Sequence, residues 1–425
     1  MNTNLKLAGR FAILLSAALL APVPSTSGQS RTDTADQYDV GADSTLERHP
    51  IDTSIKIYPT PIWSRTSGFS AGVGYEIDNL LMPRGRLLVT AKPGQHLGRY
   101  TATYFAKDAY NDPVYGLANV YYETTGRHWY YGLGPASASR NKVAVEAKML
   151  EAELRVGFQP VNRRLLIQPL VRYIRHESVG FEEWDEGAIS RLDPESLENL
   201  ELTAGSSSSG RIQKGFAFGL VGGIDLLDRA LRPRRGLLLQ ASTQRFQFDV
   251  PDGLEYDQHG FYAYGFLPVR RGVVALRAVT ILTNQRGTTP IPFYFLPSLH
   301  GRMLPGYSWD RFVAPDLFVL TAEYMHPLFN VYNIIGLDAL LSVGAGNVYD
   351  DLFDQFKADL TFEDDPSPGQ ASYPLRPSVA AGFDLYRANR SGFDFRVLVG
   401  LGTEGIRLVR FGFVHDLRDI ELSRR

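Results

Sequence analysis

The sequence contains no cysteine. This absence excludes disulfide bonds, thiolate metal sites and a cysteine nucleophile, and it also excludes a lipid anchor on an N-terminal cysteine. An excess of charge is lacking too, because 44 Lys and Arg stand against 46 Asp and Glu, a formal net charge of −2. A chain with this balance has no electrostatic bias towards a polyanion, so we expect no nucleic-acid partner.

Long apolar runs are almost absent as well, and the clearest one lies near the N-terminus. Lys6 and Arg10 lead into the mostly apolar residues 11–21, which small and polar residues follow. This order predicts a signal peptide, residues 1–28, that is removed on export. The apolar stretch is too short for a membrane-spanning helix, which needs about 20 residues. Because no other stretch could span as a helix, a membrane-embedded mature protein would have to be a β-barrel.

What the sequence does contain is a long succession of alternating segments. Residues 29–66 are polar and predict a flexible periplasmic leader. From 67 to 417, segments of about 10 residues alternate in polarity and are separated by Gly, Pro, Asn or Asp, as in barrel strands. We therefore predict an all-β fold, a transmembrane antiparallel β-barrel over residues 67–417, with residues 418–425 as a C-terminal tail.

The alternation predicts about 16 strands, an even number as single-chain bacterial barrels require. The expected strands lie at 67–78, 85–94, 98–108, 114–124, 126–134, 142–159, 165–178, 215–228, 235–250, 257–269, 271–284, 316–328, 334–349, 376–388, 392–404 and 406–417.

The lengths of the connections favour a membrane barrel over a soluble sandwich, which would also alternate. With the leader in the periplasm, the long connections 179–214, 285–315 and 350–375 all fall on the outer side. The short returns 124–127, 160–164, 268–272 and 388–392 all fall on the periplasmic side. This asymmetry is typical of outer-membrane barrels, and it predicts location in the outer membrane of a Gram-negative-type bacterium.

The last two expected strands predict which side chains face lipid. One face of each strand is apolar, and the opposite face carries residues such as Arg396 and Arg410. Leu398 is expected to face the lumen. The residues expected to face lipid are Phe393, Phe395, Val397, Val399, Phe411 and Phe413.

Patterns typical of catalysis are few. Residues 68–72 match the G-x-S-x-G pattern around Ser70, but the following residues continue a strand, whereas a nucleophile elbow needs a helix there. The histidines lie singly, without metal-ligand spacing. Asp350 with Asp351 and Asp364 with Asp365 could bind a divalent cation, although solvated loop charge explains them better. We therefore expect no enzyme, no cofactor and no metal.

Several motifs, in this order and spacing, resemble the outer-membrane assembly superfamily that includes BamA, TamA and the two-partner secretion transporters, often labelled bacterial surface antigen. The motifs lie at Tyr130 to Pro135, Asp225 to Asp228 with Arg232 to Gly236, Thr321 to Leu328, Val343 to Tyr349 and Gly382 to Leu385. The resemblance covers most of 67–417. It implies a barrel whose sixth outer loop folds back into the lumen.

In that family the sixth loop carries an Arg-Gly-Phe or Arg-Gly-Tyr tip. Here the corresponding stretch contains Arg302, Leu304, Pro305, Gly306 and Tyr307, with Pro305 at the arginine position. The family arginine meets acidic groups on the lumen wall. Of these, the strand-twelve glutamate is retained as Glu323, whereas Gly344 stands at the position of an aspartate. Losing both partners avoids an unpaired charge in a confined lumen, so we expect an altered latch.

The altered latch is expected to bring Gly306 and Tyr307 near strands twelve and thirteen, held mainly by aromatic packing and turn geometry. Arg302 could reach Glu323 as a substitute for the family arginine, or could simply be solvated. The family's insertases also carry POTRA modules, for which residues 30–66 are too short.

Three functions are compatible with the sequence. The barrel could assist insertion or translocation of a polypeptide or lipid client through a weak seam between its first and last strands. Gly68, Gly72 and Gly74, opposite Phe411 and Phe413, would form that seam, because glycines leave few stabilising side-chain pairs. Outer-membrane lipid and a periplasmic or POTRA-bearing protein are the expected partners. The second function is a passive porin-like or structural barrel. The third, an outer-membrane esterase, has only Ser70 behind it.

Overall fold

The computed structural model describes residues 54–59, 62–64, 68–70, 72–78, 80–81, 85–93, 98–107, 114–159, 164–205, 211–228, 232–249, 253–300, 303–308, 310–331, 335–363, 370–387 and 394–414. The predicted signal peptide and C-terminal tail, and most of the predicted leader, lie outside these residues. No helix in the described part of the chain is long and apolar enough to cross a membrane.

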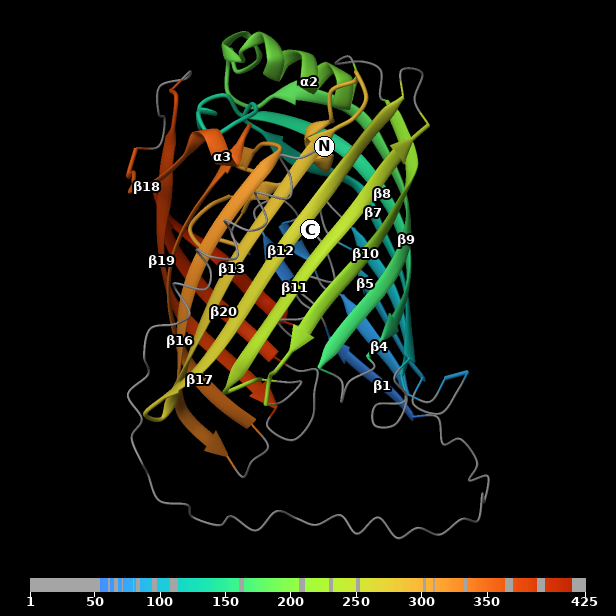
Figure 1. Ribbon diagram of the computed structural model, residues 1–425, viewed down its shortest axis with the longest axis vertical. Coiled ribbons are helices and arrows are strands. Elements are labelled where there is room, and N and C mark those ends of the chain that lie inside the picture. Colours follow the sequence, from blue (N-terminus) through green and yellow to red (C-terminus); the bar gives the residue numbers. More distant parts are fainter. Residues whose placement is uncertain are drawn as a thin grey trace. The chain divides into compact units, whose positions relative to one another are not determined.

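One large sheet dominates the described residues (Figure 1). In order of pairing, its antiparallel strands are β1 (Ser54–Pro59), β4 (Val73–Asp78), β5 (Gly85–Lys92), β6 (Arg99–Lys107), β7 (Val114–Tyr130), β8 (Val143–Phe158), β9 (Leu165–Glu183), β10 (Ile212–Asp225), β11 (Gly236–Phe248), β12 (Leu254–Val269), β13 (Gly272–Gln285), β16 (Asp316–Val331), β17 (Ile335–Tyr349), β19 (Tyr373–Arg387), β20 (Asp394–Gly402) and β21 (Gly405–Val414).

The remaining elements lie in the connections between these strands. They are the short strands β2 (Ile62–Ser64), β3 (Gly68–Ser70), β14 (Ser298–Leu299), β15 (Phe312–Val313) and β18 (Phe356–Leu360), the helices α2 (Pro194–Ala204) and α3 (Leu352–Gln355), and the 3-10 turns η1 (Ile189–Arg191) and η2 (Phe293–Phe295).

The strand succession is the one expected of an antiparallel barrel. The main sheet has 17 strands, of which β18 alone runs parallel to its neighbour, so 16 antiparallel strands remain. The registers run without a break from β1 through β4 and β5 to β20 and β21. Within the described residues, no register joins β1 to β21, so these two strands form the two ends of the curved sheet. The predicted fold class and the approximate strand number are confirmed.

Two local predictions were wrong, and their effects on the number of strands cancel. The expected turn at 124–127 does not exist, because β7 continues through it with a β-bulge between Glu123 and Gly126. Two residues of β7 oppose one residue of β8 there, so the chain bends without reversing. Conversely, β1 pairs with β4 inside the stretch 29–66 that we expected to be flexible. The two strands expected at 114–124 and 126–134 are one strand, and β1 is an additional one. The number of antiparallel strands therefore stays even.

The three long connections lie at one end of the sheet, as the sequence predicts. Long connections follow β9, β13 and β17, and these three strands run in the same direction because successive strands are antiparallel. The connection after β12 contains only two residues and lies at the opposite end. Figure 1 shows α2 and α3 at the long-loop end of the sheet. We refer to this end as the outer end.

Alternating exposure separates the two faces of the sheet. Leu398 is 5% exposed and packs with Leu340 and Ala380, whereas its neighbour Val399 is 42% exposed. Leu398 therefore faces the lumen and Val399 faces outward, as the sequence predicts. The side chains of Phe393, Phe411 and Phe413 lie outside the described part of the chain.

Candidate functional site

The sixth outer connection, residues 286–315, folds inward, as the resemblance implies. Within it, β14 and β15 pair as a small antiparallel hairpin, and Ser298 Oγ lies 3.1 Å from Asp310 Oδ1. Its tip contributes Leu304 and Tyr307 to an apolar cluster whose other members include lumen-facing residues of β13, β16 and β17. Leu304 is fully buried and Tyr307 is 3% exposed. A loop this apolar gains stability from being covered.

Aromatic packing fixes the beginning of this loop. Phe293 lies 4.5 Å from Tyr130, and Phe295 lies 4.5 Å from Phe248, measured between ring centroids. Helix α2 adds polar contacts, because Asn199 donates to the Ile291 carbonyl at 2.8 Å and accepts from the Phe293 amide at 2.9 Å. These contacts tie α2 to the sixth loop at the outer end of the lumen.

Tyr307 shares the apolar cluster with residues of β16 and β17, the strands expected for it, and the tip also makes contacts with β19 and with the end of β20. Tyr307 Oη donates to the Pro377 carbonyl of β19 at 2.8 Å and accepts from the Thr403 amide at 3.4 Å. Gly306 has φ +100°, and a Cβ added to it would lie 2.6 Å from the backbone nitrogen of Gly402. Only glycine fits this left-handed conformation and close approach. Burial raises the pKa of the Tyr307 phenol, so the phenol remains a neutral donor.

Leu304, rather than Gly306, contacts strand thirteen of the barrel, β17. A Cβ added to Gly344 would lie 2.9 Å from Leu304 Cδ1 and 2.9 Å from the Leu320 carbonyl oxygen. The family aspartate therefore has no room here, because the loop's own leucine occupies the space. Ser378 Oγ donates to the Pro305 carbonyl, so a backbone contact at position 305 is made without an arginine.

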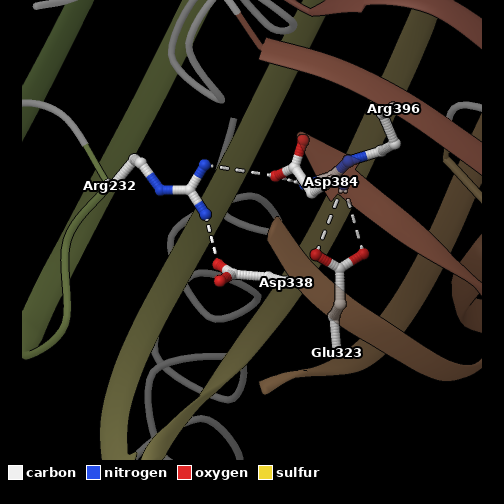
Figure 2. A network of polar contacts seen from close by, with 5 residues as sticks. All are labelled: Arg232, Glu323, Asp338, Asp384 and Arg396. Atoms are coloured by element: carbon white, nitrogen blue, oxygen red, sulfur yellow. Dashed lines mark hydrogen bonds and ion pairs between the residues drawn. The ribbon is translucent and has the colours of Figure 1, made fainter. Parts of the chain in front are cut away.

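Glu323 has a different partner from the one considered for it. Its carboxylate accepts from Arg396 of β20 at 3.3 Å, and Arg396 also donates to Asp384 of β19 at 3.2 Å (Figure 2). The substitute Arg302 lies outside the described residues. The charge opposite Glu323 therefore comes from the barrel wall.

The same network extends to a turn on another part of the barrel. Asp338 of β17 and Asp384 of β19 are direct cross-strand partners, an unfavourable placement for two like charges. Arg232, in the turn between β10 and β11, lies between them: it contacts Asp338 and donates to Asp384 at 3.5 Å (Figure 2). The Arg232 guanidinium also lies 3.3 Å from the ring centroid of Tyr386. Arg232 thus bridges two carboxylates from strands far away in the sheet, and Asp384 is compensated by Arg396 as well.

The sequence indicated the members of this network but not their association. Arg232 and Asp384 both belong to motifs that carry the family resemblance, and Arg396 was expected on the lumenal face. Asp384 and Arg396 both fall at lumen-facing positions of neighbouring strands, and this pattern could have indicated that they pair. Nothing in the sequence pattern relates Arg232 to β17 and β19.

A second ion pair, also missed from the sequence, ties the loop to the hairpin of β20 and β21. Arg311 and Glu404 are in direct contact, with side chains 0% and 4% exposed. Arg311 also donates to the Ser137 carbonyl at 2.8 Å. The Phe312 ring lies between two guanidiniums, 4.1 Å from that of Arg311 and 4.0 Å from that of Arg376. The sixth loop is therefore fastened at the point where the last strand begins.

The predicted seam residues are only partly brought together. Gly74 lies on β4 between Tyr58 of β1 and Thr90 of β5, so β1 occupies the edge of β4 that we expected to be free. Gly68 pairs with Ser64 in the β2–β3 hairpin, and Gly72 lies between β3 and β4. The β2 strand lies close to β21, which carries Phe411 and Phe413. In the described residues, β1 therefore lies beside β4, and the β2–β3 hairpin, which contains Gly68, lies close to β21.

The residues considered for chemistry are placed as follows. Ser70 ends β3, and β4 begins at Val73, so a strand follows it. Asp351 caps α3 by accepting from the Phe353 amide at 2.9 Å. In the part of the chain that the structure describes, no group of three or more metal-ligating side chains occurs. Asp364 and Asp365 lie outside the described residues.

Comparisons with known proteins agree with this geometry at the level of the fold. No protein-family model and no curated protein sequence matches the chain. Among solved structures, BamA from Haemophilus ducreyi lacking POTRA domains 1–3 matches with a TM-score of 0.55 at 17% identity. That match covers 85% of this chain and 69% of the BamA chain. The chain therefore has the fold of the BamA barrel, and the predicted resemblance is confirmed in its fold.

Two further matches are more distant. CdiB from Acinetobacter baumannii matches at 13% identity with a TM-score of 0.47, over 82% of this chain and 56% of that chain. CdiB from Escherichia coli matches at 11% identity with a TM-score of 0.48, over 82% of this chain and 58% of that chain. The chain thus spans a little over half the length of the two CdiB structures.

Proposed function

We propose that this barrel, which has the BamA fold, assists insertion or translocation of a polypeptide or lipid client in the outer membrane of a Gram-negative-type bacterium. The client would use the junction between β1 and β21. The observation that carries the proposal is the end of the sheet: within the described residues, the succession of registers begins with β1 on β4 and ends with β21 on β20, and no register joins β1 to β21. Ile55 and Ile57 of β1 are 64% and 66% exposed. An edge of this kind can pair with an incoming strand.

The sixth loop supports the same role. Gly306, Tyr307 and Arg311 contact the β20–β21 hairpin or the end of β20, so the position of the loop and the position of the last strand depend on each other. Outer-membrane lipid surrounds the barrel in this proposal, and a periplasmic or POTRA-bearing protein would deliver the client. The proposal contains no enzymatic step.

Engineered disulfides across the junction test the proposal. Since the chain has no cysteine, Ile57→Cys can be combined with a cysteine introduced at each position of 407–411 in turn, and only the intended bond can form. The purified variants would be reconstituted in liposomes and offered a urea-denatured eight-stranded outer-membrane barrel. We expect the cross-linked barrel to lose its acceleration of client folding, and a reductant to restore it.

The matched control is a cross-link inside the sheet. Ala263 of β12 and Ala278 of β13 are direct register partners. An Ala263→Cys, Ala278→Cys disulfide should leave client folding unchanged. Equal folding rates with and without the β1–β21 cross-link would overturn the use of this junction.

A passive porin-like or structural barrel is the alternative. Steady conductance in a planar bilayer, together with no acceleration of client folding by the unmodified protein, would favour it. Asn199 hydrogen-bonds α2 to the sixth loop at the outer end of the lumen. A helix and a loop held there argue against a wide, permanently open channel.

A further inference from the structure

The outer connection between β17 and β19 carries unusually exposed apolar side chains. It contains α3 and β18, and all five residues of β18 are exposed. The exposed fractions are 43% for Phe353, 41% for Phe356, 55% for Leu360 and 76% for Phe362. We call these four residues the apolar collar. Large exposed apolar groups this close together mark a surface that another apolar phase covers.

Phe356 fixes the collar to the outward face of the barrel wall. Phe356 contacts Phe318 of β16 edge-on, with 5.5 Å between ring centroids. Phe318 faces outward, because its neighbours Leu317 and Val319 are fully buried in the cluster that contains Leu304 of the sixth loop. In Figure 1, β18 stands beside β19 at the edge of the view, near the outer end.

The height of Phe318 on the wall coincides with the expected outer boundary of the membrane. A membrane-spanning β-strand needs about 9 to 11 residues. Phe318 is the register partner of Asn347 on β17, and the outward-facing positions of β17 begin at Ile335 near the short-turn end. Eleven residues counted from Ile335 end at Ala345, and Asn347, the partner of Phe318, is the next outward-facing position of β17.

Outer-membrane barrels place aromatic girdles at this boundary. On β17 the outward-facing position at this height is Asn347, which is not aromatic, is 1% exposed and donates to the Pro374 carbonyl at 2.9 Å. The collar supplies aromatic rings there from a loop. Directly below it, Leu320, Val343 and Val379 are 50%, 48% and 47% exposed on the outward face, so the collar continues the lipid-facing surface.

The connection from 350 to 363 carries five carboxylates, Asp350, Asp351, Asp354, Asp359 and Glu363, and one amine, Lys357. Lys357 pairs with Asp359 at 2.7 Å, which leaves β18 without net charge. Asp351 is engaged as the cap of α3. The carboxylates can stay solvated on the polar side of the interface, so the attraction to the membrane comes from the apolar side chains and not from basic residues.

We propose that the apolar collar inserts into the boundary between headgroups and acyl chains of the outer leaflet and replaces part of the aromatic girdle on this side of the barrel. Lipid covers this surface, and the collar contacts it through apolar side chains. The collar would hold the β17–β19 connection against the membrane and away from the outer mouth of the lumen.

Single-cysteine variants test this placement. Phe362→Cys, labelled with an environment-sensitive fluorophore, would be measured in phosphatidylcholine nanodiscs with and without a lipid that carries a shallow spin-label quencher. Leu320→Cys is the lipid-facing reference, and Glu198→Cys on the exposed side of α2 is the aqueous reference. We expect quenching and a blue shift at position 362 that match position 320 and exceed position 198.

Leu360→Cys provides a second reporter should labelling at position 362 disturb the loop. Quenching at both 360 and 362 no greater than at 198 would overturn the proposal. Protection of these positions only in the presence of another protein would equally overturn it, because the surface would then be a protein-docking site. Neither result depends on whether the barrel inserts clients.

Discussion

Arg311 of the sixth loop and Glu404 of the β20–β21 hairpin form an ion pair whose side chains are 0% and 4% exposed. The pair joins the inward-folded loop to the beginning of the last strand. The tip of this loop has Pro305 at the position where the family that the chain resembles has arginine. The loop thus keeps apolar contacts with strands twelve and thirteen, and its buried ion pair lies at the hairpin of strands fifteen and sixteen.

Breaking this pair should loosen the sixth loop. Glu404→Gln leaves the buried Arg311 guanidinium without its counter-charge, and removal of one partner of a buried pair costs about 3 to 5 kcal/mol. We expect a lower unfolding midpoint and faster proteolysis within 286–315. Lys148→Gln is the control, since Lys148 and Glu177 form an exposed pair at 3.5 Å. Such pairs contribute about 1 kcal/mol or less. Similar effects of the two substitutions would contradict a special role for the Arg311–Glu404 pair.

Tyr307 should contribute more to the latch than Arg302 does. Tyr307→Ala removes a buried ring and should destabilise the barrel by about 3 to 5 kcal/mol, or raise its conductance. Tyr307→Phe keeps the ring and loses only the phenol hydrogen bonds, so about 1 kcal/mol is expected. Thermal unfolding in detergent and planar-bilayer conductance measure both effects. An Arg302→Ala variant more damaged than Tyr307→Ala would show that a charged latch persists.

Loss of Arg232 should destabilise the ion-pair network that it forms with Asp338 and Asp384. Arg232→Gln leaves the neighbouring carboxylates of Asp338 and Asp384 facing each other, and we expect a loss of about 1 to 3 kcal/mol in unfolding free energy. Adding Asp338→Asn should recover part of the loss, because it removes the repulsion. A double-mutant cycle on denaturant unfolding gives the coupling between the two positions. Additive effects would contradict the compensation of two carboxylates by one arginine.

The cost of placing a charge on the outward face of the barrel should depend on its depth in the bilayer. Leu341 lies near the middle of β17 and is 52% exposed on the outward face, whereas Val331 ends β16 at the short-turn end and is 47% exposed. Leu341→Arg should cost about 2 to 4 kcal/mol in a lipid bilayer, and Val331→Arg about 1 kcal/mol or less. Folding titrations into lipid vesicles measure both costs. Equal costs would show that the membrane boundary is misplaced.

The sequence predicts the strands well wherever alternation is regular. The expected strand 142–159 corresponds to Val143–Phe158, and the expected 271–284 corresponds to Gly272–Gln285. The failure at 124–127 has a local cause. Thr124 and Gly126 are residues typical of turns, but the Thr124 amide donates to the Gly98 carbonyl at 2.9 Å, so the chain stays in the sheet. A bulge and a turn use the same residue types, and only the register of the partner strand distinguishes them.

The candidate site was predictable in its parts and not in its connections. The inward fold of the sixth loop follows from its apolar residues and from the resemblance. Its actual partners do not, because Tyr307 meets Pro377 and Arg311 meets Glu404 across large separations in sequence. Side-chain contacts across a lumen depend on strand stagger and loop path, which alternation within one strand does not encode.

Chemical cross-linking between the sixth loop and the last hairpin tests the central claim most directly. Ser308 Oγ lies 3.5 Å from Glu404 Oε2, and the adjacent Thr403 amide donates to Tyr307 Oη at 3.4 Å. Ser308→Cys and Thr403→Cys, which leave Glu404 in place, should therefore be joined by a short cross-linker with two thiol-reactive groups in intact outer membranes. We predict a cross-linked product in high yield, with neither cysteine modified by a bulky, membrane-impermeant maleimide added from outside. No cross-link, together with ready labelling of the cysteine at position 308, would show that the loop lies outside the barrel and would contradict the claim.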